Sequence, residues 1–302
     1  MEKMQMKTIM PKKELEAYRE EQLQLLKSDV VFYNALLDLG LNEAQILNQI
    51  ALFIDYHEDK KACENCLGLS FCKKERPYTQ LCLVKEDEQM ERKIRLCPYM
   101  QKRRMLEKQF LVHDFPDEWF GKSLENKDVD IRNDRGQLIR FMAAIVRGTS
   151  LKNWLYLHGK TRLGKSYVLA VLCQELIAKH PHQTCAYLKT PSRFKELSDL
   201  SFVDKAQMQE KLNTYIDADI LVLDDFGNEY QSDFVRDTIL NPLLDARSKS
   251  NKITMFTSRY TLNELIELHG KTVAGKIKMK RQVREVIENN AEIISLNCVS
   301  VY

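Results

Sequence analysis

The sequence predicts an α/β fold in which helices cover both faces of a parallel β-sheet, preceded by a small helical unit. Three observations support this prediction. An apolar segment, a glycine-containing turn and an apolar helix follow one another over residues 154–178, and a second apolar segment, 220–223, ends in two aspartates. Strand-like and helix-like segments then alternate towards the end of the chain, a pattern typical of parallel sheets.

The composition is that of a water-soluble globular protein, because 44% of the 302 residues are hydrophobic and 29% are charged. This length leaves room for two domains. The net charge of +3 is too small to indicate a nucleic-acid partner by itself. No apolar run approaches the length of a membrane span, and residues 1–26 lack the apolar core of a signal peptide. We therefore expect a cytoplasmic protein with no membrane partner.

Helices are predicted for the first part of the chain. Pro11–Lys27 has proline in its first turn, and Asp29–Leu39 ends at Gly40. Asn42 is the expected N-cap of a third helix that continues to Tyr56. These helices form either a packed helical core alone or a docking surface for a partner protein. The helices by themselves leave both interpretations open.

Cysteines cluster after these helices, and five of the eight lie between Cys63 and Cys97. Disulfides are rare in a reducing compartment, and the spacing Cys63-x₂-Cys66 is that of half a tetrahedral zinc site. The predicted ligands of a structural zinc ion are Cys63, Cys66, Cys72 and Cys82. Cys97 or His57 could replace the fourth ligand. Structural thiols without a metal are the alternative.

The domain boundary is expected where the composition changes. A stretch rich in lysine, arginine and glutamate, 90–108, is followed by a helix-breaking Asp-Phe-Pro sequence at 114–116. Residues 1–105 are predicted to form the helical, zinc-binding domain, residues 106–130 a linker and the start of the second domain, and residues 131–302 the second domain. An amphipathic helix is expected at 136–147.

Residues His158–Ser166 fill every fixed position of the phosphate-binding pattern G-x-x-x-x-G-K-[ST]. The pattern lies between an expected strand, Trp154–Leu157, and an expected helix, Tyr167–Ala178, as such a loop requires. Backbone N–H groups of the loop and the positive end of the helix then face an anionic phosphate. The predicted nucleotide-binding residues are Gly159, Lys160, Thr161, Arg162, Leu163, Gly164, Lys165 and Ser166. An ordinary glycine-containing turn is the alternative.

Three residues of this loop have individual roles. Lys165 is expected to reach the β and γ phosphates of ATP, and the hydroxyl of Ser166 is expected to ligate Mg²⁺. Arg162 stands where many such loops have another glycine, which predicts a stiffer loop.

A second strand, Ile220–Leu223, ends in Asp224 and Asp225. Ligands of parallel α/β sheets bind at the carboxyl ends of the strands, so we expect this acidic pair to face the phosphate loop. In such a site Asp224 would hold Mg²⁺, and Asp225 would polarise the water that attacks the γ-phosphate. Solvent-exposed acids at the end of a strand are the alternative.

The remaining elements continue the alternation. They are a strand at 184–188, a polar helical stretch at 192–215, a helix at 233–249, a strand at 252–258, a basic segment at 276–284 and a strand at 293–296. No internal repeat or low-complexity tract is visible in the sequence.

Four motifs together resemble one family. They are Gly159–Ser166, Ile220–Gly227, Met255–Tyr260 (Met-Phe-Thr-Ser-Arg-Tyr) and a Cys-x₂-Cys-x₅-Cys pattern that begins at Cys63. Over nearly its whole length the chain is similar to the bacterial replicative helicase loaders of the DnaI type, AAA+ P-loop NTPases related to DnaC and to the transposition ATPase IstB. The resemblance implies an N-terminal domain that carries zinc and binds the replicative helicase. It also implies an AAA+ domain that binds ATP and single-stranded DNA.

The resemblance adds candidates at the sensor and the metal. It makes Thr257 and Ser258 the nucleotide sensor at the end of a strand, although an asparagine is usual at or beside this point and Arg259 follows here. Cys82 stands where the family has a histidine before a Leu-Val pair, which we interpret as a replaced ligand with the metal kept.

The resemblance also implies an arginine that acts at the site of a neighbouring subunit, and residues that contact DNA. AAA+ enzymes complete their site with an arginine from a neighbouring subunit. Arg281 is our first candidate and Arg284 the second, with a solvent-exposed basic face as the alternative. The residues that match the family's contacts to single-stranded DNA are Phe202, Ser232 and Phe234. Phe234 could equally be a core residue.

The leading hypothesis is a slow ATPase that uses ATP, Mg²⁺ and Zn²⁺, assembles through its AAA+ domain, and helps to place a replicative hexameric helicase on single-stranded DNA. Such a step belongs to initiation or restart of replication. The expected catalytic residues are Asp225, Ser258, Arg281 and Arg284. The alternatives are an IstB-like transposition or DNA-remodelling ATPase, and an adaptor that binds nucleotide with negligible turnover. The sequence leaves open the oligomeric state and the residues that contact the helicase.

Overall fold

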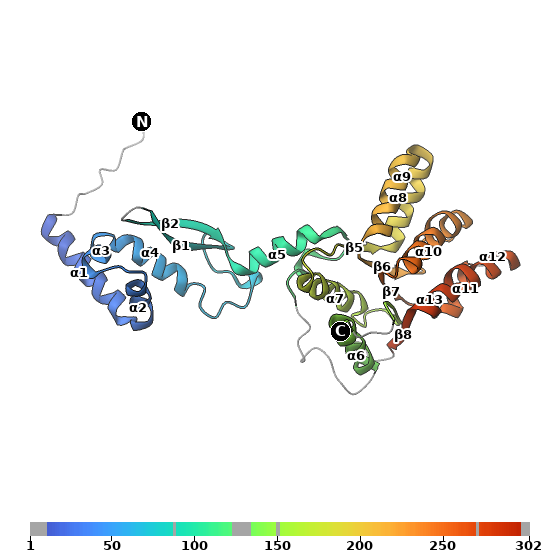
Figure 1. The fold of residues 1–302 in the computed structure, drawn as a ribbon, viewed down its shortest axis with the longest axis horizontal. Helices are drawn as coiled ribbons and strands as arrows, with labels where there is room; N and C mark the ends of the chain where they lie inside the picture. The colour runs from blue at the N-terminus through green and yellow to red at the C-terminus, as the bar shows by residue number, and fades with distance from the viewer. Residues whose placement is uncertain (1–10, 87–88, 123–133, 149–151, 270–271, 297–302) are drawn as a thin grey trace. The chain divides into compact units, whose positions relative to one another are not determined.

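The structure is a computed structural model that describes residues 11–86, 89–122, 134–148, 152–269 and 272–296. The chain divides into two compact units, which Figure 1 colours from blue to red along the sequence. The N-terminal unit comprises Met1–Lys102, and the C-terminal unit comprises Arg103–Tyr302. None of the helices in the described ranges combines the length and the apolar composition that a bilayer span needs.

Four helices open the N-terminal unit: α1 (Lys12–Ser28), α2 (Val30–Asp38), α3 (Glu43–Asn48) and α4 (Ile50–Lys61). The predicted cap at Asn42 is confirmed, because its side chain accepts a hydrogen bond from the Gln45 N–H and the Gln45 side chain accepts one from the Asn42 N–H. The third predicted helix is broken at Gln49 into α3 and α4. The buried core of these helices includes Leu26, Phe32, Leu36, Ile46 and Phe53.

A β-hairpin, which the sequence analysis did not predict, follows these helices. After the 3₁₀ helix η1 (Leu69–Phe71), strand β1 (Thr79–Glu86) pairs antiparallel with β2 (Gln89–Leu96). Met90 is buried while most of β2 is exposed, so this strand lacks the apolar alternation that marks a half-buried strand. The predicted helical domain is therefore a unit of helices and a hairpin. Helix α5 (Pro98–Gln109) comes next.

The C-terminal unit is built on a six-stranded sheet in which every neighbouring pair is parallel. The strand order is β3-β5-β6-β7-β4-β8. The strands are β3 (Phe110–His113), β4 (Trp154–Gly159), β5 (Cys185–Lys189), β6 (Ile220–Phe226), β7 (Ile253–Ser258) and β8 (Ala291–Leu296). The predicted parallel sheet is thus confirmed, and β3 adds an edge strand within the segment 106–130.

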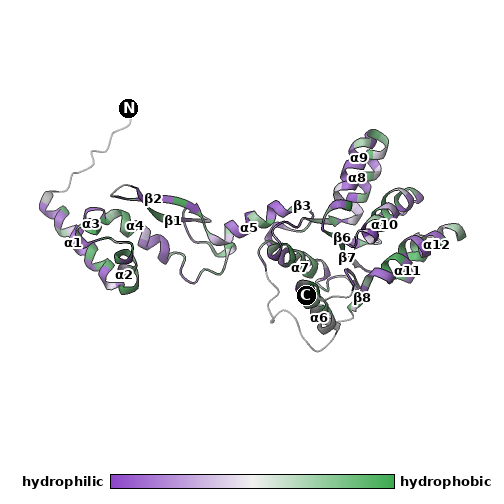
Figure 2. Cartoon of the chain, viewed as in Figure 1, coloured by the Kyte–Doolittle hydropathy of each residue, from purple (hydrophilic) through white to green (hydrophobic). Residues whose placement is uncertain are grey.

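Helices cover both faces of this sheet, as predicted (Figure 1). Along β4, Leu155 and Leu157 face a cluster that includes α6 (Asp134–Arg147) and α7 (Lys165–Lys179), whereas Trp154 and Tyr156 face the opposite cluster. The elements of that second cluster include α8 (Thr190–Val203), α9 (Lys205–Asp217), the π-helix η3 (Val235–Leu240), α10 (Asn241–Lys249), α11 (Leu262–His269), α12 (Val273–Met279), the π-helix η4 (Lys280–Arg284) and α13 (Glu285–Asn290). Figure 2 shows hydrophobic and polar residues interspersed along these helices, as expected when one face packs on a sheet.

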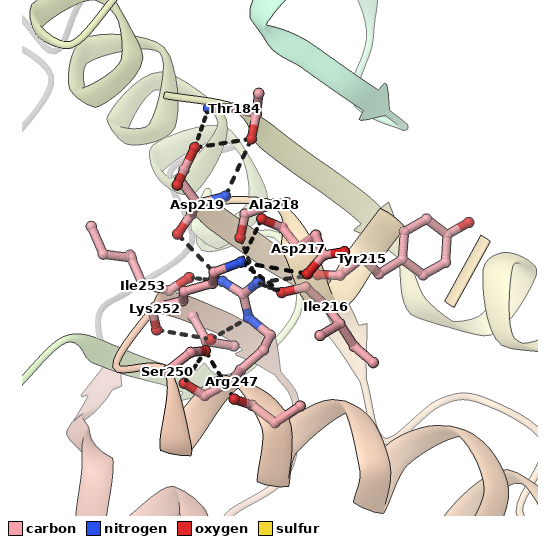
Figure 3. A network of polar contacts seen from close by, with 12 residues as sticks. Thr184, Tyr215, Ile216, Asp217, Ala218, Asp219, Arg247, Ser250, Lys252 and Ile253 are labelled. Carbon is pink, nitrogen blue, oxygen red and sulfur yellow. Dashed lines mark hydrogen bonds and ion pairs between the residues drawn. The ribbon is translucent and has the colours of Figure 1, made fainter. Parts of the chain in front are cut away.

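A fully buried arginine aligns the two central strands at their amino ends (Figure 3). Arg247 of α10 donates through Nη1 to the carbonyl oxygens of Tyr215, Ile216 and Ala218 at 2.6–3.1 Å. Its other nitrogens reach the carbonyls of Asp219 and Ile253 and the hydroxyl of Thr254. Burial lowers the pKa of Arg247 to about 10. One side chain therefore joins the end of α9 to the starts of β6 and β7.

Candidate nucleotide-binding site

A pocket of about 330 Å³ lies at the carboxyl ends of β4, β6 and β7, a size within the usual range of small-ligand sites. Its described lining consists of Trp119, residues 161–167, Lys189, Asp224, Asp225, Thr257, Ser258 and Arg259. The structure thus brings the phosphate loop and the acidic pair into one pocket, although their strands are separated in the sheet by β7.

Backbone geometry explains the two glycines of the loop. Gly159 has φ of +143°, and a Cβ atom there would lie 2.3 Å from the carbonyl oxygen of Leu296 in β8, so no other residue fits. Gly164 has φ of +78° and is the left-handed N-cap of α7. Arg162 also adopts a left-handed conformation, with φ of +64°. A side chain in this region costs about 1–2 kcal/mol, so the loop is strained at this residue.

Lys165, the first residue of α7, is buried beneath the loop. Its ammonium donates hydrogen bonds to the carbonyl oxygens of Gly159 at 2.8 Å and Lys160 at 2.6 Å. Burial lowers the pKa of Lys165, while the charges of Asp224 and Asp225 act in the opposite direction. The ammonium therefore has a position between loop and acids, where a polyphosphate would need a cation.

Asp224 and Ser166 form the candidate magnesium site. The Thr257 hydroxyl donates to Asp224 Oδ1, and the Ser166 side chain also interacts with this carboxylate. Burial raises the pKa of Asp224, although these two interactions oppose the shift. A hydroxyl and a carboxylate oxygen side by side are the hard oxygen ligands that Mg²⁺ takes next to phosphates, so the residues present fit the metal.

Asp225 has an unusual backbone, with φ of +59°, where the pairing of β6 and β7 shifts register between Leu223 and Phe226. Its N–H donates to the Thr257 hydroxyl at 2.9 Å. Its carboxylate accepts a hydrogen bond from the Asn228 side chain and lies 3.8 Å from Nε of Arg259. Left-handed backbone at a non-glycine residue is a strained feature that often occurs at functional sites.

The two predicted sensor residues differ in what their hydroxyls contact. The Thr257 hydroxyl touches both aspartates of the pocket. The Ser258 hydroxyl donates to the carbonyl of Phe226 at 2.7 Å and accepts from the Tyr260 N–H at 3.1 Å. Ser258 is only 1% exposed, so its hydroxyl supports the backbone behind the pocket. Thr257 is the better placed of the two to respond to a ligand.

An aromatic wall of the pocket was missed by the sequence analysis. Trp119, at the end of the 3₁₀ helix η2 (Asp117–Trp119), is stacked on Phe115 with 6.5 Å between ring centroids and meets Tyr167 edge-on at 5.4 Å. Gln174 of α7 holds this turn, donating to the Trp119 carbonyl at 2.9 Å and accepting from the Gly121 N–H at 2.8 Å. The aromatic residues at 115, 119 and 120, just before the expected domain, were the signal that could have revealed it.

Several predicted site residues lie elsewhere. The described pocket lining includes neither Arg281 nor Arg284, both on η4, and Arg284 donates to Glu288 at 2.7 Å. Phe202, near the end of α8, is 87% exposed. The Ser232 hydroxyl accepts from the Val235 N–H at 3.1 Å, at the start of η3. Phe234 is partly buried and packs against the core.

The predicted zinc site is not supported by the structure. In the described ranges, no three histidine, cysteine or acidic side chains gather in a way that could hold a metal ion. Cys82 lies on β1 with its thiol donating to the Lys93 carbonyl at 3.3 Å, and Cys72 accepts from the Tyr78 N–H at 3.4 Å. The residues concerned are Cys63, Cys66, Cys72 and Cys82, with Cys97 and His57 as substitutes. His57 instead pairs with Asp29 at 2.9 Å, and Cys97 is buried.

Comparison with known proteins gives consistent matches. Residues 139–283 match the family model of the bacterial DnaA ATPase domain. The chain is 34% identical over 111 residues to the replicative helicase loader DnaI of Bacillus subtilis strain 168, covering 37% of this chain and 34% of that protein. It is 23% identical over 121 residues to the replicative helicase loader DnaC of Escherichia coli K12, covering 40% and 48%.

A solved structure matches a larger part of this chain than these sequence comparisons do. A crystal structure of DnaI is similar with a TM-score of 0.53 and 30% identity, covering 65% of this chain and 99% of that one. The chain thus spans about a third of the curated DnaI protein and about half of DnaC, but nearly all of the solved DnaI chain. The loop 159–166 and the pair 224–225 fall within the residues that match the ATPase-domain family. The chain belongs to the DnaI family, and its C-terminal unit has the AAA+ P-loop fold.

Proposed function

We propose that this chain is an ATP-dependent loader that binds a replicative DNA helicase and helps to place it on single-stranded DNA. The pocket that joins Lys165, Ser166 and the pair Asp224–Asp225 carries the nucleotide part of this proposal. The helicase part is supported by the relatives, two of which are named replicative helicase loaders.

The residues of the pocket would have separate roles in binding and hydrolysing a nucleotide. The N–H groups of the loop and the Lys165 ammonium would bind the phosphates, and Ser166 with Asp224 would hold Mg²⁺. Bound Mg²⁺ would supply positive charge that offsets the charge developing on the phosphates. Asp225 would orient the attacking water, and the Thr257 hydroxyl contacts the Asp224 carboxylate and the Asp225 backbone N–H. Trp119 would contact the base, since it forms the aromatic wall of the same pocket.

The helicase would dock on the N-terminal unit. Val30 and Val31 of α2 are 64% and 83% exposed, and Leu39 just after it is 50% exposed. Exposed aliphatic side chains of this kind favour the docking interpretation of the helices over a core alone. Release would follow from a difference in partner affinity between the ATP and ADP states, because a ligand shifts an equilibrium only through differential binding.

Assembly and DNA contact complete the proposal. Arg281 and Arg284 lie outside the pocket of their own chain, as a residue that serves the neighbouring subunit would. Phe202 is the exposed aromatic ring among the three DNA candidates and would stack on a base.

The test uses the full chain and the replicative helicase of the same organism. We expect the helicase to co-purify with the chain, and phosphate release from ATP to fall on the order of 100-fold or more in Asp225→Asn. Lys165→Ala should lose ATP affinity while keeping helicase capture. A chain that releases no more phosphate than Asp225→Asn would be the non-catalytic adaptor. Capture of a transposase in place of the helicase would favour the IstB-like alternative.

A further inference from the structure

A buried charge cluster lies on the π-helix η3, outside the described lining of the nucleotide pocket. Arg236 is only 3% exposed, and its Nη1 atom donates to Asp233 Oδ1 at 2.6 Å. Its Nε and Nη2 atoms donate to the two carboxylate oxygens of Asp237 at 2.8 and 2.9 Å. The hydrogen bonds from Arg236, with a smaller contribution from Lys278, lower the pKa of Asp237 to about 2. Asp237 is therefore a charged carboxylate with a fixed orientation.

Asp237 also contacts a helix from a distant part of the sequence. Its Oδ2 atom accepts a hydrogen bond at 2.9 Å from Nζ of Lys278 in α12. The elements α12, η4 and α13 follow one another directly, so residues 273–290 form one continuous helical segment. Arg281, which is exposed, lies three residues after Lys278, which is less than one helical turn. The ion pair therefore lies close to the first candidate for the arginine that serves a neighbouring chain.

The π-helix η3 is also connected to the nucleotide pocket. Residues 226–234 join Asp225 to η3. In this segment the Asn228 side chain donates to the Asp225 carboxylate, and the Ser232 hydroxyl caps the start of η3 at 3.1 Å. A hydrogen-bonded segment thus links the catalytic acid to the helix that carries Asp237.

Apolar packing holds η3 and the segment 273–290 together. One buried cluster contains apolar residues of both: Val235, Ile239, Met279 and Val283. Burial of apolar surface is non-directional, so it does not by itself fix the rotation of one helix against the other. A charge-assisted hydrogen bond has a preferred geometry. The pair of Asp237 and Lys278 therefore adds a directional contact to this packing.

The two candidate arginines differ in how they are held. Arg284 donates to Glu288 of its own chain at 2.7 Å, whereas Arg281 is exposed. An arginine that reaches into a neighbouring pocket must be presented accurately, because a misplacement of about 1 Å can lower a rate by about 100-fold. Arg281 therefore depends on the orientation of the helical turn that carries it.

We propose that Asp237 is a positioning residue for Arg281: through its ion pair with Lys278, it fixes the helical turn that presents Arg281 to the pocket of a neighbouring copy of this chain. This inference rests on the proposed ATPase function and self-assembly. Because η3 is also linked to Asp225, the pocket of one chain and the arginine that it gives to the next chain depend on the same contact.

The experiment breaks the ion pair from its exposed side, in the full chain. Lys278 is 50% exposed, so Lys278→Glu brings two like charges together without changing the core. Lys278→Arg keeps the positive charge. Lys276→Glu is the matched control, because Lys276 lies on the same helix, is 43% exposed and pairs with Glu267 of α11 instead of η3.

Phosphate release from ATP is measured over a range of protein concentrations. The rate per unmutated chain should rise as copies assemble. Lys278→Glu should bind ATP as the unmutated chain does, but should lose at least about tenfold of the rate reached at high concentration. Lys278→Arg and Lys276→Glu should match the unmutated chain. Equal rates for Lys278→Glu and the unmutated chain at every concentration overturn the positioning role.

A mixing experiment separates positioning of the arginine from general damage. Asp225→Asn lacks the catalytic acid but keeps a correctly held Arg281, whereas Lys278→Glu keeps the acid. A mixture of the two should release phosphate faster than the sum of their separate rates. Replacing Asp225→Asn in the mixture by the double variant Asp225→Asn with Lys278→Glu should remove this gain.

The outcomes of the mixing experiment distinguish two failures. Absence of a gain in the first mixture, or a Lys278→Glu chain that no longer assembles in light scattering, overturns the positioning role alone. An unmutated chain that hydrolyses no ATP, or whose rate does not rise with concentration, overturns the proposed ATPase function or self-assembly on which this inference rests.

Discussion

In one unit of this protein the residues of the predicted motifs come together in space, and in the other unit they do not. In the C-terminal unit, the loop after β4, the acids of β6 and the threonine of β7 come together because parallel strands end at one edge of the sheet. In the N-terminal unit, the cysteines lie on a turn, near a 3₁₀ helix and on a strand, and they do not gather. A motif predicts a site reliably when the architecture itself brings its parts together.

The largest loss of stability is expected when Arg247 is replaced, because its side chain joins the starts of β6 and β7. Arg247→Met leaves several buried carbonyl groups without a donor, and we expect it to destabilise the C-terminal unit by about 3–5 kcal/mol. Chemical denaturation measures this loss. Lys249→Met on the same helix is the control, because Lys249 is 75% exposed. Equal stability of the two variants would show that strand alignment does not depend on Arg247.

A pH effect is expected at Glu229, which is 2% exposed and whose pKa burial raises to about 7. The folded chain keeps this proton up to about pH 7, whereas the unfolded chain loses it near pH 4.5. Stability is therefore highest below the unfolded pKa and falls as pH rises through this window, by at most about 3 kcal/mol.

Glu229→Gln is expected to remove this slope while keeping an acceptor for the Gly227 N–H. Denaturation of both proteins at pH 5 and pH 8 gives the comparison. Asp224, whose pKa burial also raises, adds a slope of the same sign in each protein, so the difference between them isolates Glu229. Parallel pH profiles would refute the assignment.

A smaller change, a gain in stability, is expected when Arg162 is replaced by glycine. Its φ of +64° is a left-handed conformation that glycine adopts without strain. Arg162→Gly should stabilise the C-terminal unit by up to about 1 kcal/mol, since relief of strain exceeds the added entropy of the unfolded chain. Arg162→Ala removes the same charge but keeps the strain and should show no such gain. Thermal melts of the three proteins decide between strain and charge.

Trp119 should report nucleotide binding through its fluorescence. The chain has two tryptophans, and Trp154 is 1% exposed in the core with its Nε1–H donating to the Lys252 carbonyl. Stacking of one aromatic pair contributes about 0.5–1.5 kcal/mol, so Trp119→Phe should weaken ATP binding only slightly while removing the emission change. An emission change that persists in Trp119→Phe would place the base elsewhere.

The smallest effect is expected from the cysteines of the N-terminal unit. As the thiols lie in the described residues, Cys66→Ser should leave helicase capture and nucleotide affinity unchanged. Elemental analysis per chain measures the metal. One zinc per chain that disappears in Cys66→Ser would show that this segment rearranges around a metal, and would remove the contrast between the two units.

The predictable parts of the fold are those whose residues carry a clear periodicity. The apolar runs of β4, β5, β6 and β7 and the cap at Asn42 were placed from sequence within a few residues. Strand β2 was missed because its side chains are mostly exposed and charged. Strand β3 was missed because it is four residues long and lies at the edge of the sheet after a polar helix.

Within the site, residue types were predictable and side-chain directions were not. The pattern at 159–166 and the pair Asp224–Asp225 were found because local spacing encodes them. Which of Thr257 and Ser258 faces the acids depends on the alternation of β7, and a shift of one residue reverses it. The aromatic residues at 115, 119 and 120 indicate an aromatic cluster, but the place of Trp119 in the pocket depends on a turn far from the loop in sequence.

The close approach of Gly159 to Leu296 makes the last described strand a wall of the phosphate loop. A fragment cut before β8 would retain every recognisable nucleotide motif and still lack the backbone against which the loop is shaped. The shortest functional version of this domain therefore extends through Leu296, well past the residues by which such domains are usually identified.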